Sequence, residues 1–314
     1  MGYDIILQNS RVDFQTGGTL VHALSPTSIR FRSGQLTALV GESGSGKSVL
    51  GMSILGLLPP TARVSGSCRY GEYDLYRCTE AEMRDIRCKI IGLIPQNPVQ
   101  ALNPVLRLAR QLTEPLTAHC GMTRAQALRQ TRESLRQFGF SDPDRLLRSF
   151  SFQLSGGMNQ RVVALMGLAC KPDWVIADEP TKGLDAILRR QVFEILSSAR
   201  ASGAGSMLII THDLPLAGKL CDQVAVLYQG QIVEYGPCQE VFQRPLHPYT
   251  KGLLRAIPEA GMVPIPHRVA GREPKESQCR FYPRCTQACP ACCAGPIQDC
   301  AVEKDRGVRC MRYA

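Results

Sequence analysis

The chain contains no uninterrupted apolar run long enough to cross a bilayer. Its longest such run, VLGMSILGLLPP at residues 49–60, falls short of the roughly 18–20 residues that a membrane-spanning helix requires. The N-terminal stretch carries charged residues and lacks the apolar segment of a secretory signal. We therefore expect a protein that works in the cytosol.

The sequence also lacks an internal repeat, a zinc-finger or RNA-binding motif, and interleaved aromatic and basic residues. Its net charge is nevertheless +10, and residues 245–314 hold eleven Lys or Arg against six Asp or Glu. Docking near an anionic membrane leaflet or an acidic partner explains this charge more simply than nucleic acid does. We expect no nucleic-acid partner.

Strand-like and helical segments alternate along most of the chain, which predicts an α/β fold with a parallel sheet. A stretch rich in Arg, Gln and Leu with helical periodicity predicts an inserted helical subdomain, and the Pro-, Gly- and Cys-rich tail lacks a core pattern. The expected strands lie at 4–8, 35–40, 90–95, 174–178, 206–212 and 223–236. The predicted domains are a core at 1–96 and 154–245, the helical subdomain at 97–153 and a C-terminal extension at 246–314.

The octapeptide GESGSGKS at 41–48 fits the P-loop pattern and lies between a strand-like and a helical segment. Glycines allow the backbone N–H groups to wrap phosphates. Lys47 would neutralise β- and γ-phosphate oxygens, and the Ser48 hydroxyl would join a Mg²⁺ shell. The predicted nucleotide contacts are Gly41, Ser43, Gly44, Ser45, Gly46, Lys47, Ser48 and Val49.

A second candidate phosphate-binding loop, LSGGMNQR at 154–161, precedes the apolar helical stretch VVALMGLAC. It offers a serine hydroxyl, backbone N–H groups and a helix N-terminus to an anion. One nucleotide needs only one such cradle. The pair of loops therefore predicts an ATPase whose nucleotides are shared across a sandwich dimer.

Two carboxylates follow the apolar strand-like run WVIA. We assign Asp178 to Mg²⁺, through water, and Glu179 to the water that attacks the γ-phosphate. Taken alone, the pair also fits an ordinary acidic loop after a strand. The P-loop upstream favours the catalytic interpretation.

These motifs, in this order, resemble those of the ATP-binding subunits of ATP-binding cassette (ABC) transporters, which implies a P-loop NTPase core with a mixed sheet. The sequence departs from many relatives at Lys182-Gly183, where they have Thr-Ala, and at Ser151-Phe152-Gln153, where they have Pro-His-Gln. The matching segments are Walker A at 41–48, the Q-loop Gln96, the signature motif at 154–160, Walker B at 175–179, the D-loop at 183–185 and the switch histidine His212.

The resemblance implies roles for these positions. Gln96 would contact Mg²⁺ or the attacking water, and His212 would bridge the γ-phosphate and Glu179. Phe14 would stack on adenine, although core packing is an alternative for this side chain. Signature and D-loop contacts with the nucleotide are expected from Ser155, Gly156, Gly157 and Asp185.

Two segments, 91–108 and 247–258, resemble the ATPases of dipeptide, oligopeptide and nickel importers. The implied partners are a second and often non-identical ATPase, two membrane permease subunits and, indirectly, an extracytoplasmic binding protein. The chain would then lie peripherally on the cytoplasmic face of the inner membrane. Uptake of peptides, or of nickel or a metal chelate, would be its task. A soluble ABC ATPase acting on ribosomes or DNA, and a redox or metal sensor that gates the motor, are alternatives.

Fourteen cysteines are many for a cytosolic chain, and seven of them lie between 279 and 310. Disulfides do not suit a reducing compartment, and a small tail with little apolar surface gains stability from a metal. Many peptide-importer ATPases carry a similar C-terminal pattern, which resembles a site for a four-iron four-sulfur cluster. Zinc or no metal remain alternatives. The cysteines that fit the pattern are Cys279, Cys285, Cys292 and Cys310, whereas Cys289, Cys293 and Cys300 are extra to it.

Overall fold

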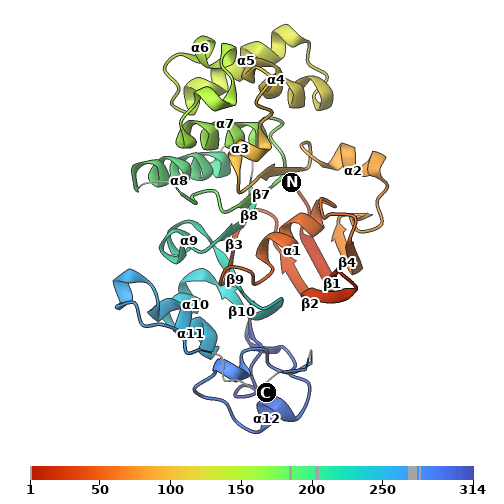
Figure 1. Ribbon diagram of the computed structural model, residues 1–314, viewed down its shortest axis with the longest axis vertical. Helices are drawn as coiled ribbons and strands as arrows, with labels where there is room; N and C mark the ends of the chain where they lie inside the picture. The colour runs from red at the N-terminus through yellow and green to blue at the C-terminus, as the bar shows by residue number, and fades with distance from the viewer. Residues whose placement is uncertain (1, 184–185, 202–204, 268–273, 276) are drawn as a thin grey trace. The chain divides into compact units, whose positions relative to one another are not determined.

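A computed structural model describes the chain except for residues 1, 184–185, 202–204, 268–273 and 276 (Figure 1). It forms two compact units. Unit 1 comprises residues 1–3, 32–34 and 78–209, and unit 2 comprises residues 4–31, 35–77 and 210–314. The domain boundaries proposed from the sequence remain a prediction.

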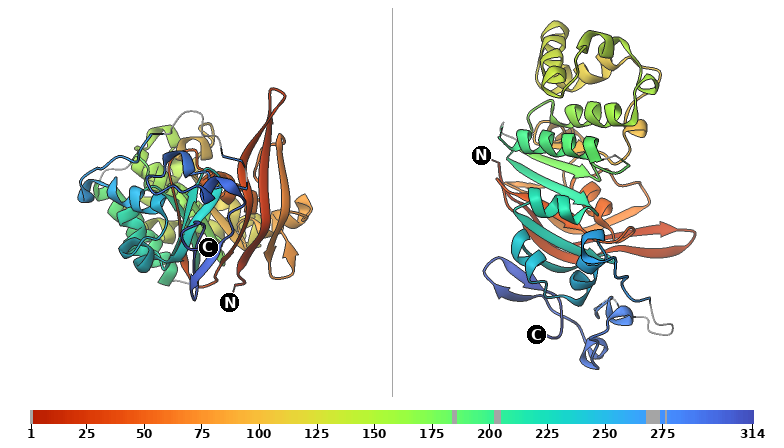
Figure 2. Two further views of the ribbon diagram at one scale, coloured as in Figure 1. Left: turned by 90° about the horizontal axis from the view of Figure 1, so that it is seen from below. Right: turned by 90° about the vertical axis from the view of Figure 1, so that its left-hand side faces the viewer.

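Unit 2 contains an antiparallel sheet with the strand order β2-β1-β4-β5, whose long strands run side by side in Figure 2. A Gly17-Gly18 turn joins its first two strands, and both glycines have the positive φ that a tight two-residue hairpin requires. Of the strands in this sheet, the sequence analysis predicted only the one at 4–8, which falls at the start of β1. The strands are β1 (Ile5–Thr16), β2 (Thr19–Phe31), β4 (Ala62–Tyr70) and β5 (Tyr73–Asp74).

A second sheet of unit 2 has the order β3-β9-β10-β12-β11. β3 pairs in parallel with β9, and the remaining neighbours are antiparallel. The mixed sheet that the resemblance implied is confirmed, whereas the parallel sheet predicted from the alternation of segments does not extend to β10, β11 and β12. The strand-like stretch at 223–236 is in fact a hairpin, because Gln229 and Gly230 both have positive φ. The strands are β3 (Leu36–Val40), β9 (Gln223–Tyr228), β10 (Gln231–Pro237), β11 (Cys300–Glu303) and β12 (Arg306–Val308).

The helices of unit 2 include one that begins at the P-loop lysine and several in the C-terminal extension. They are α1 (Lys47–Ile54), α9 (Leu214–Leu220), α10 (Cys238–Gln243), α11 (Pro248–Arg255), α12 (Ala291–Ala294) and the short 3₁₀ turns Pro258–Ala260 and Tyr282–Arg284.

Unit 1 contains strands in the order β8-β7-β6, with β6 and β7 parallel. Their continuous apolar runs are largely buried, as expected for strands covered on both faces. The strands are β6 (Ile91–Ile94), β7 (Trp174–Asp178) and β8 (Ser206–Thr211), of which residues up to Ile209 belong to this unit.

The remaining regular elements of unit 1 are helices, and four of them, α3 to α6, form the expected helical insertion, whose exact bounds stay a prediction. Leucines from α4, α5 and α6 pack with Phe140 and with the apolar face of α7 in one core. Thr123 is the N-cap of α5, and its hydroxyl and the Gln126 side chain form a capping box. The helices are α2 (Glu80–Ile86), α3 (Pro98–Ala101), α4 (Leu108–His119), α5 (Arg124–Gln137), α6 (Pro143–Arg148), α7 (Gly156–Leu168), α8 (Ala186–Ala201) and the 3₁₀ turn Ser151–Gln153.

Within the described residues, no helix combines the length and the apolarity that a membrane span demands.

Candidate functional site

The P-loop leaves the buried strand β3 and ends at the first turn of α1. Gly46 has φ 101°, and a Cβ on it would lie 2.7 Å from the Ala23 carbonyl oxygen. A Cβ on Gly41 would lie 2.1 Å from the Leu227 carbonyl oxygen. Both positions therefore require glycine, because the loop passes directly against the backbone of neighbouring strands.

The loop is already arranged around its lysine. The Lys47 ammonium donates to the carbonyl oxygens of Gly41 and Glu42, each at 2.9 Å. Ser45 is 4% exposed, and its hydroxyl has no hydrogen-bond partner among the described residues. A buried hydroxyl without a partner is unusual and fits a position that waits for a ligand oxygen.

The β9–β10 hairpin supports this loop from one side. Gly230 donates its N–H to the Ser45 carbonyl oxygen at 2.8 Å, and it accepts from the Ser25 N–H at 2.9 Å. The left-handed turn at Gln229 and Gly230 thus fixes one edge of the P-loop.

In unit 1, the predicted carboxylates lie at the end of β7. Asp178 is 2% exposed and Glu179 is 8% exposed. Glu179 adopts φ 49°, a left-handed conformation that side chains other than glycine rarely take. Such strain persists where the surroundings fix it, and it is concentrated at functional sites.

The signature motif forms the N-terminus of α7. Ser155 is the N-cap, and its hydroxyl accepts the Met158 N–H at 3.3 Å. Ser155 and Gly156 are exposed, while Gly157 is buried. Because α7 is 13 residues long, its N-terminus presents a positive dipole end and bare N–H groups at an exposed serine.

The second half of the same motif has a structural task that the sequence reasoning did not assign. The buried Gln160 donates from Nε2 to the Pro180 carbonyl oxygen at 2.8 Å. Pro180 directly follows Glu179, so α7 and the end of β7 are linked within unit 1. Asn159 makes a second anchor by donating to the Ser151 carbonyl oxygen at 3.1 Å.

The other predicted residues fall at element boundaries. Gln96 is partly buried just after β6, and His212 is exposed just after β8. Phe14 lies on β1 opposite Val21 and is partly buried, so its role stays a prediction. Asp185 lies outside the described residues.

The four cysteines of the expected set line one pocket in the C-terminal extension, together with Phe281 and His247. Among the extra cysteines, Cys289 lies beside this set, with its Sγ 3.5 Å from Cys292 Sγ. Cys293 is exposed and donates to the Pro290 carbonyl oxygen. The pocket residues in question are Cys279, Cys285, Cys292 and Cys310.

Burial raises the pKa of each of these four thiols, to about 12 for Cys279 and about 11 for Cys292. They are therefore protonated at neutral pH unless a cation binds them. In the described part of the chain, no three His, Cys, Asp or Glu side chains are arranged to hold a single metal ion.

Two known protein families match most of the chain. Residues 24–182 match the family described as "ABC transporter". Residues 233–292 match the family described as "Oligopeptide/dipeptide transporter, C-terminal region". The two matches cover both the P-loop and the first cysteines of the extension.

Individual proteins agree with these matches. The dipeptide transport ATP-binding protein DppD of Bacillus subtilis is 39% identical over 91% of this chain and 88% of its own length. The ATP-binding cassette MJ0796, solved as a dimer in a post-hydrolysis state with ADP and Pi, is 25% identical. Its TM-score is 0.67, over 74% of this chain and 98% of MJ0796. A subunit of the cbiONQ ABC transporter complex of Clostridium perfringens, cbiO1, gives a TM-score of 0.64 at 23% identity, over 78% of this chain and 92% of cbiO1.

Proposed function

The chain belongs to the ATP-binding subunits of ABC transporters, and on that premise we propose that it powers an importer of dipeptides or oligopeptides. It binds ATP with Mg²⁺ and hydrolyses ATP in a cycle coupled to transport, as this family does. The match of residues 233–292 to the C-terminal region of oligopeptide and dipeptide transporters is the observation that carries the choice of cargo.

The proposed chemistry assigns one task to each polar residue. Lys47 leaves its two carbonyl partners to bind β- and γ-phosphate oxygens. The Ser45 hydroxyl, which has no partner among the described residues, donates to a phosphate oxygen. Glu179 orients the attacking water and accepts its proton, so no phosphoenzyme forms. Mg²⁺, when bound, would neutralise charge on the phosphate oxygens, held by Ser48, Gln96 and, through water, Asp178.

The signature residues act on a nucleotide held by a second ATPase. Ser155 and Gly156 are exposed at a helix N-terminus, which supports contact with a phosphate from outside the chain. His212, also exposed, would reach the γ-phosphate when the two ATPases close. Asp185 is proposed to contribute to the same closed state.

The remaining partners follow from the importer assignment. Two membrane permease subunits receive the motion, an extracytoplasmic binding protein delivers the cargo, and the second ATPase is a copy or a related chain. The place of work is the cytoplasmic face of the cell membrane. The basic balance of residues 245–314 supports a position beside anionic lipid headgroups.

The catalytic assignment is tested with Glu179→Gln in the purified chain. We expect ATP to bind with unchanged affinity and hydrolysis to fall by about 10²–10⁴-fold, the range for removing a general base. Glu194→Gln, an exposed pair partner of Arg190, is a matched control that should hydrolyse at the normal rate. Unchanged turnover in Glu179→Gln would remove that residue from its role.

The cargo is tested in the organism that carries the gene. Deletion should abolish growth of an amino-acid auxotroph on a dipeptide that contains the required amino acid, and the wild-type chain should restore growth. Glu179→Gln should not restore it. Loss of nickel accumulation with normal peptide growth would instead assign the importer to nickel.

For the extension we further propose a four-iron four-sulfur cluster held by Cys279, Cys285, Cys292 and Cys310. The four cysteines, of which Cys292 and Cys310 are buried and the others partly buried, share one pocket with apolar walls, and soft thiolates suit iron–sulfur clusters. Bound iron would turn the thiols into thiolates and tie four distant points of the tail together. The cluster serves here as a structural element.

Anaerobic reconstitution with iron and sulfide tests this cluster. Replacement of any one of the four cysteines by serine should abolish visible absorption and iron binding. Cys293→Ser and Cys300→Ser are the controls and should leave both unchanged. A chain that binds zinc and no iron under these conditions would decide for the alternative metal.

A further inference from the structure

A salt bridge connects the second residue of the P-loop with the cysteine-rich extension. Arg284 Nη1 lies 2.8 Å from Glu42 Oε2, and Nη2 lies 3.0 Å from Glu42 Oε1, so the pairing is bidentate. The Arg284 side chain is 18% exposed and that of Glu42 is 37% exposed. Bidentate, charge-assisted pairs of this kind are among the stronger and more directional hydrogen bonds in proteins.

The backbone of Glu42 is held by the same region. Its N–H donates to the Tyr249 hydroxyl at 2.9 Å, and Tyr249 is fully buried. The Glu42 carbonyl oxygen in turn accepts from the Lys47 ammonium. We call the three residues Glu42, Tyr249 and Arg284 the P-loop contact, because through them the extension fixes a peptide that holds the P-loop lysine.

An aromatic cluster makes this contact rigid. The ring of Tyr228 lies 4.6 Å from Tyr249 and 5.2 Å from Phe281, measured between centroids. The Arg284 guanidinium lies 5.7 Å above the Tyr228 ring, and its Nε donates to the Pro266 carbonyl oxygen. Arginine held on several sides loses little further freedom when it pairs with a carboxylate.

A second arginine of the same turn reaches the other edge of the P-loop. Arg280 donates to the Gln229 carbonyl oxygen in the β9–β10 hairpin. The neighbouring Gly230 N–H holds the Ser45 carbonyl oxygen. The turn between Cys279 and Cys285 therefore supports the loop at two separate points.

The charge of Glu42 gives this support a consequence for the ligand. A carboxylate within a phosphate-binding loop repels a polyanionic nucleotide, and the repulsion is strong where water is partly excluded. Arg284 neutralises that charge, and its hydrogen bonds to Glu42 raise the pKa of the guanidinium. Without Arg284, the loop would keep an uncompensated negative charge and a less fixed Glu42 peptide.

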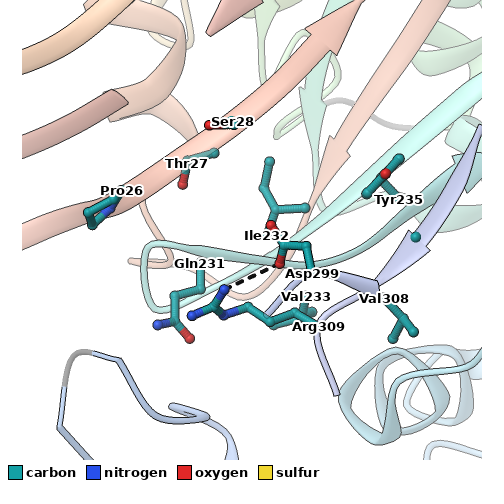
Figure 3. Close-up of a pocket in the computed structure, with 11 residues that line it drawn as sticks. Pro26, Thr27, Ser28, Gln231, Ile232, Val233, Tyr235, Asp299, Val308 and Arg309 are labelled. Atoms are coloured by element: carbon teal, nitrogen blue, oxygen red, sulfur yellow. Dashed lines mark hydrogen bonds and ion pairs between the residues drawn. The ribbon is translucent and has the colours of Figure 1, made fainter. Parts of the chain in front are cut away.

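Another pocket of unit 2 carries no comparable argument. Figure 3 shows its lining by strands β2, β10 and β12 and the pairing of Arg309 with Asp299. The two side chains are 3.3 Å apart, from Nη1 to Oδ1. Arg309 and Asp299 pair with each other, and among the described residues that line the pocket no other side chain is charged. Arg309 nevertheless provides a matched reference, because its side chain is 19% exposed and it belongs to the same extension.

We propose that Arg284 and Tyr249 are positioning residues for nucleotide binding: the C-terminal extension holds Glu42 and neutralises it, and thereby sets the affinity of the P-loop for MgATP. This role concerns ATP binding only and does not depend on which cargo is imported. It also gives the cysteine-rich extension a direct effect on the motor.

The test measures affinity for Mg²⁺ and a non-hydrolysable ATP analogue by calorimetry on the full-length chain. Arg284→Ala should weaken binding by about tenfold, the effect of losing one strong charge-assisted contact. KM for ATP should rise by a similar factor while kcat stays close to normal. Arg284→Lys, which keeps the charge but not the bidentate geometry, should bind the analogue with an affinity between those of the wild-type chain and Arg284→Ala. Arg309→Ala should bind like the wild-type chain.

A double-mutant cycle separates this role from a general loss of structure. Because Arg284 acts through Glu42, the variant Glu42→Gln/Arg284→Ala should bind no more weakly than Arg284→Ala alone. Tyr249→Phe, which keeps the ring and removes the hydroxyl, should weaken binding in the same direction. Unchanged affinity in Arg284→Ala, or losses in the double variant that multiply, would overturn the proposal. A loss of affinity in Arg309→Ala equal to that in Arg284→Ala would also overturn it.

Discussion

His247 offers a quantitative test of the structure through pH. It is 1% exposed, and its Nδ1 accepts the Tyr249 N–H at 3.0 Å at the start of α11. Burial, with a smaller effect of Lys251, lowers the pKa of this imidazole from 6.5 to about 3. The ring is therefore neutral in the folded chain across the whole range in which an exposed histidine would gain a proton.

The sign of the effect follows from proton binding. Between about pH 6.5 and pH 3 the unfolded chain binds a proton at His247 that the folded chain does not. The contribution of His247 to the free energy of unfolding is therefore fully present above about pH 6.5. It falls by about 1.4 kcal/mol per pH unit between about pH 6.5 and about pH 3. From pH 7.5 to pH 4.5 this residue alone should lower the free energy of unfolding by about 2.7 kcal/mol.

The matched variant is His247→Asn. Asparagine can cap a helix from the same position, and Asn97 does so before Pro98 in α3, as His247 does before Pro248. Urea unfolding followed by circular dichroism at pH 7.5 and 4.5 gives the comparison. The wild-type chain should lose about 2.7 kcal/mol more than the variant over this interval. Equal losses would refute the neutral, buried imidazole.

Two further substitutions test the packing of unit 1. Gln160→Met leaves the buried Pro180 carbonyl oxygen without its partner, and it should lower the free energy of unfolding by about 1–3 kcal/mol in urea titrations. No change would contradict the link between α7 and the end of β7. Gly92→Ala places a Cβ 2.1 Å from the Gly167 carbonyl oxygen and should cost about 1–3 kcal/mol by the same measurement. Gly295→Ala, which meets open space, should be neutral, and a tolerated Gly92→Ala would disprove the close approach of α7 to β6.

The sequence predicted those parts of the fold whose signals are local. β3 and β7 are short apolar runs with every residue buried, and a period-free apolar run is a clear sign of a covered strand. The P-loop was equally predictable, because its fixed residues lie within eight consecutive positions between a strand-like and a helical segment. The helical insertion followed from the periodicity of its Arg-, Gln- and Leu-rich stretch, whereas the mixed sheet was expected only from the family resemblance.

The antiparallel sheet of unit 2 had no comparable signal. β4 (Ala62–Tyr70) is mostly exposed and mixes Arg, Ser and Gly with few apolar residues. The pairing of β1 with β2 also changes register between Leu7 and Ser10, so no regular alternation runs along it. These strands are specified by their partners, which a single segment of sequence does not reveal.

The P-loop contact escaped prediction for a related reason. Glu42 and Arg284 are 242 positions apart, and neither residue type is unusual where it stands. The cysteine spacing drew attention to Cys279 and Cys285 as candidate ligands. The arginine between them reaches outward to Glu42, and only the folded chain brings that pair together.

The placement of Tyr249 restricts how this protein can be divided. A fragment that stopped at residue 246 would retain every Walker and signature residue, yet the Glu42 amide would lose its acceptor and the carboxylate its counterion. Such a shortened cassette would be a poor substitute for the whole chain in nucleotide assays. Proteolytic trimming of the last seventy residues should likewise weaken MgATP binding, although every predicted phosphate ligand would remain.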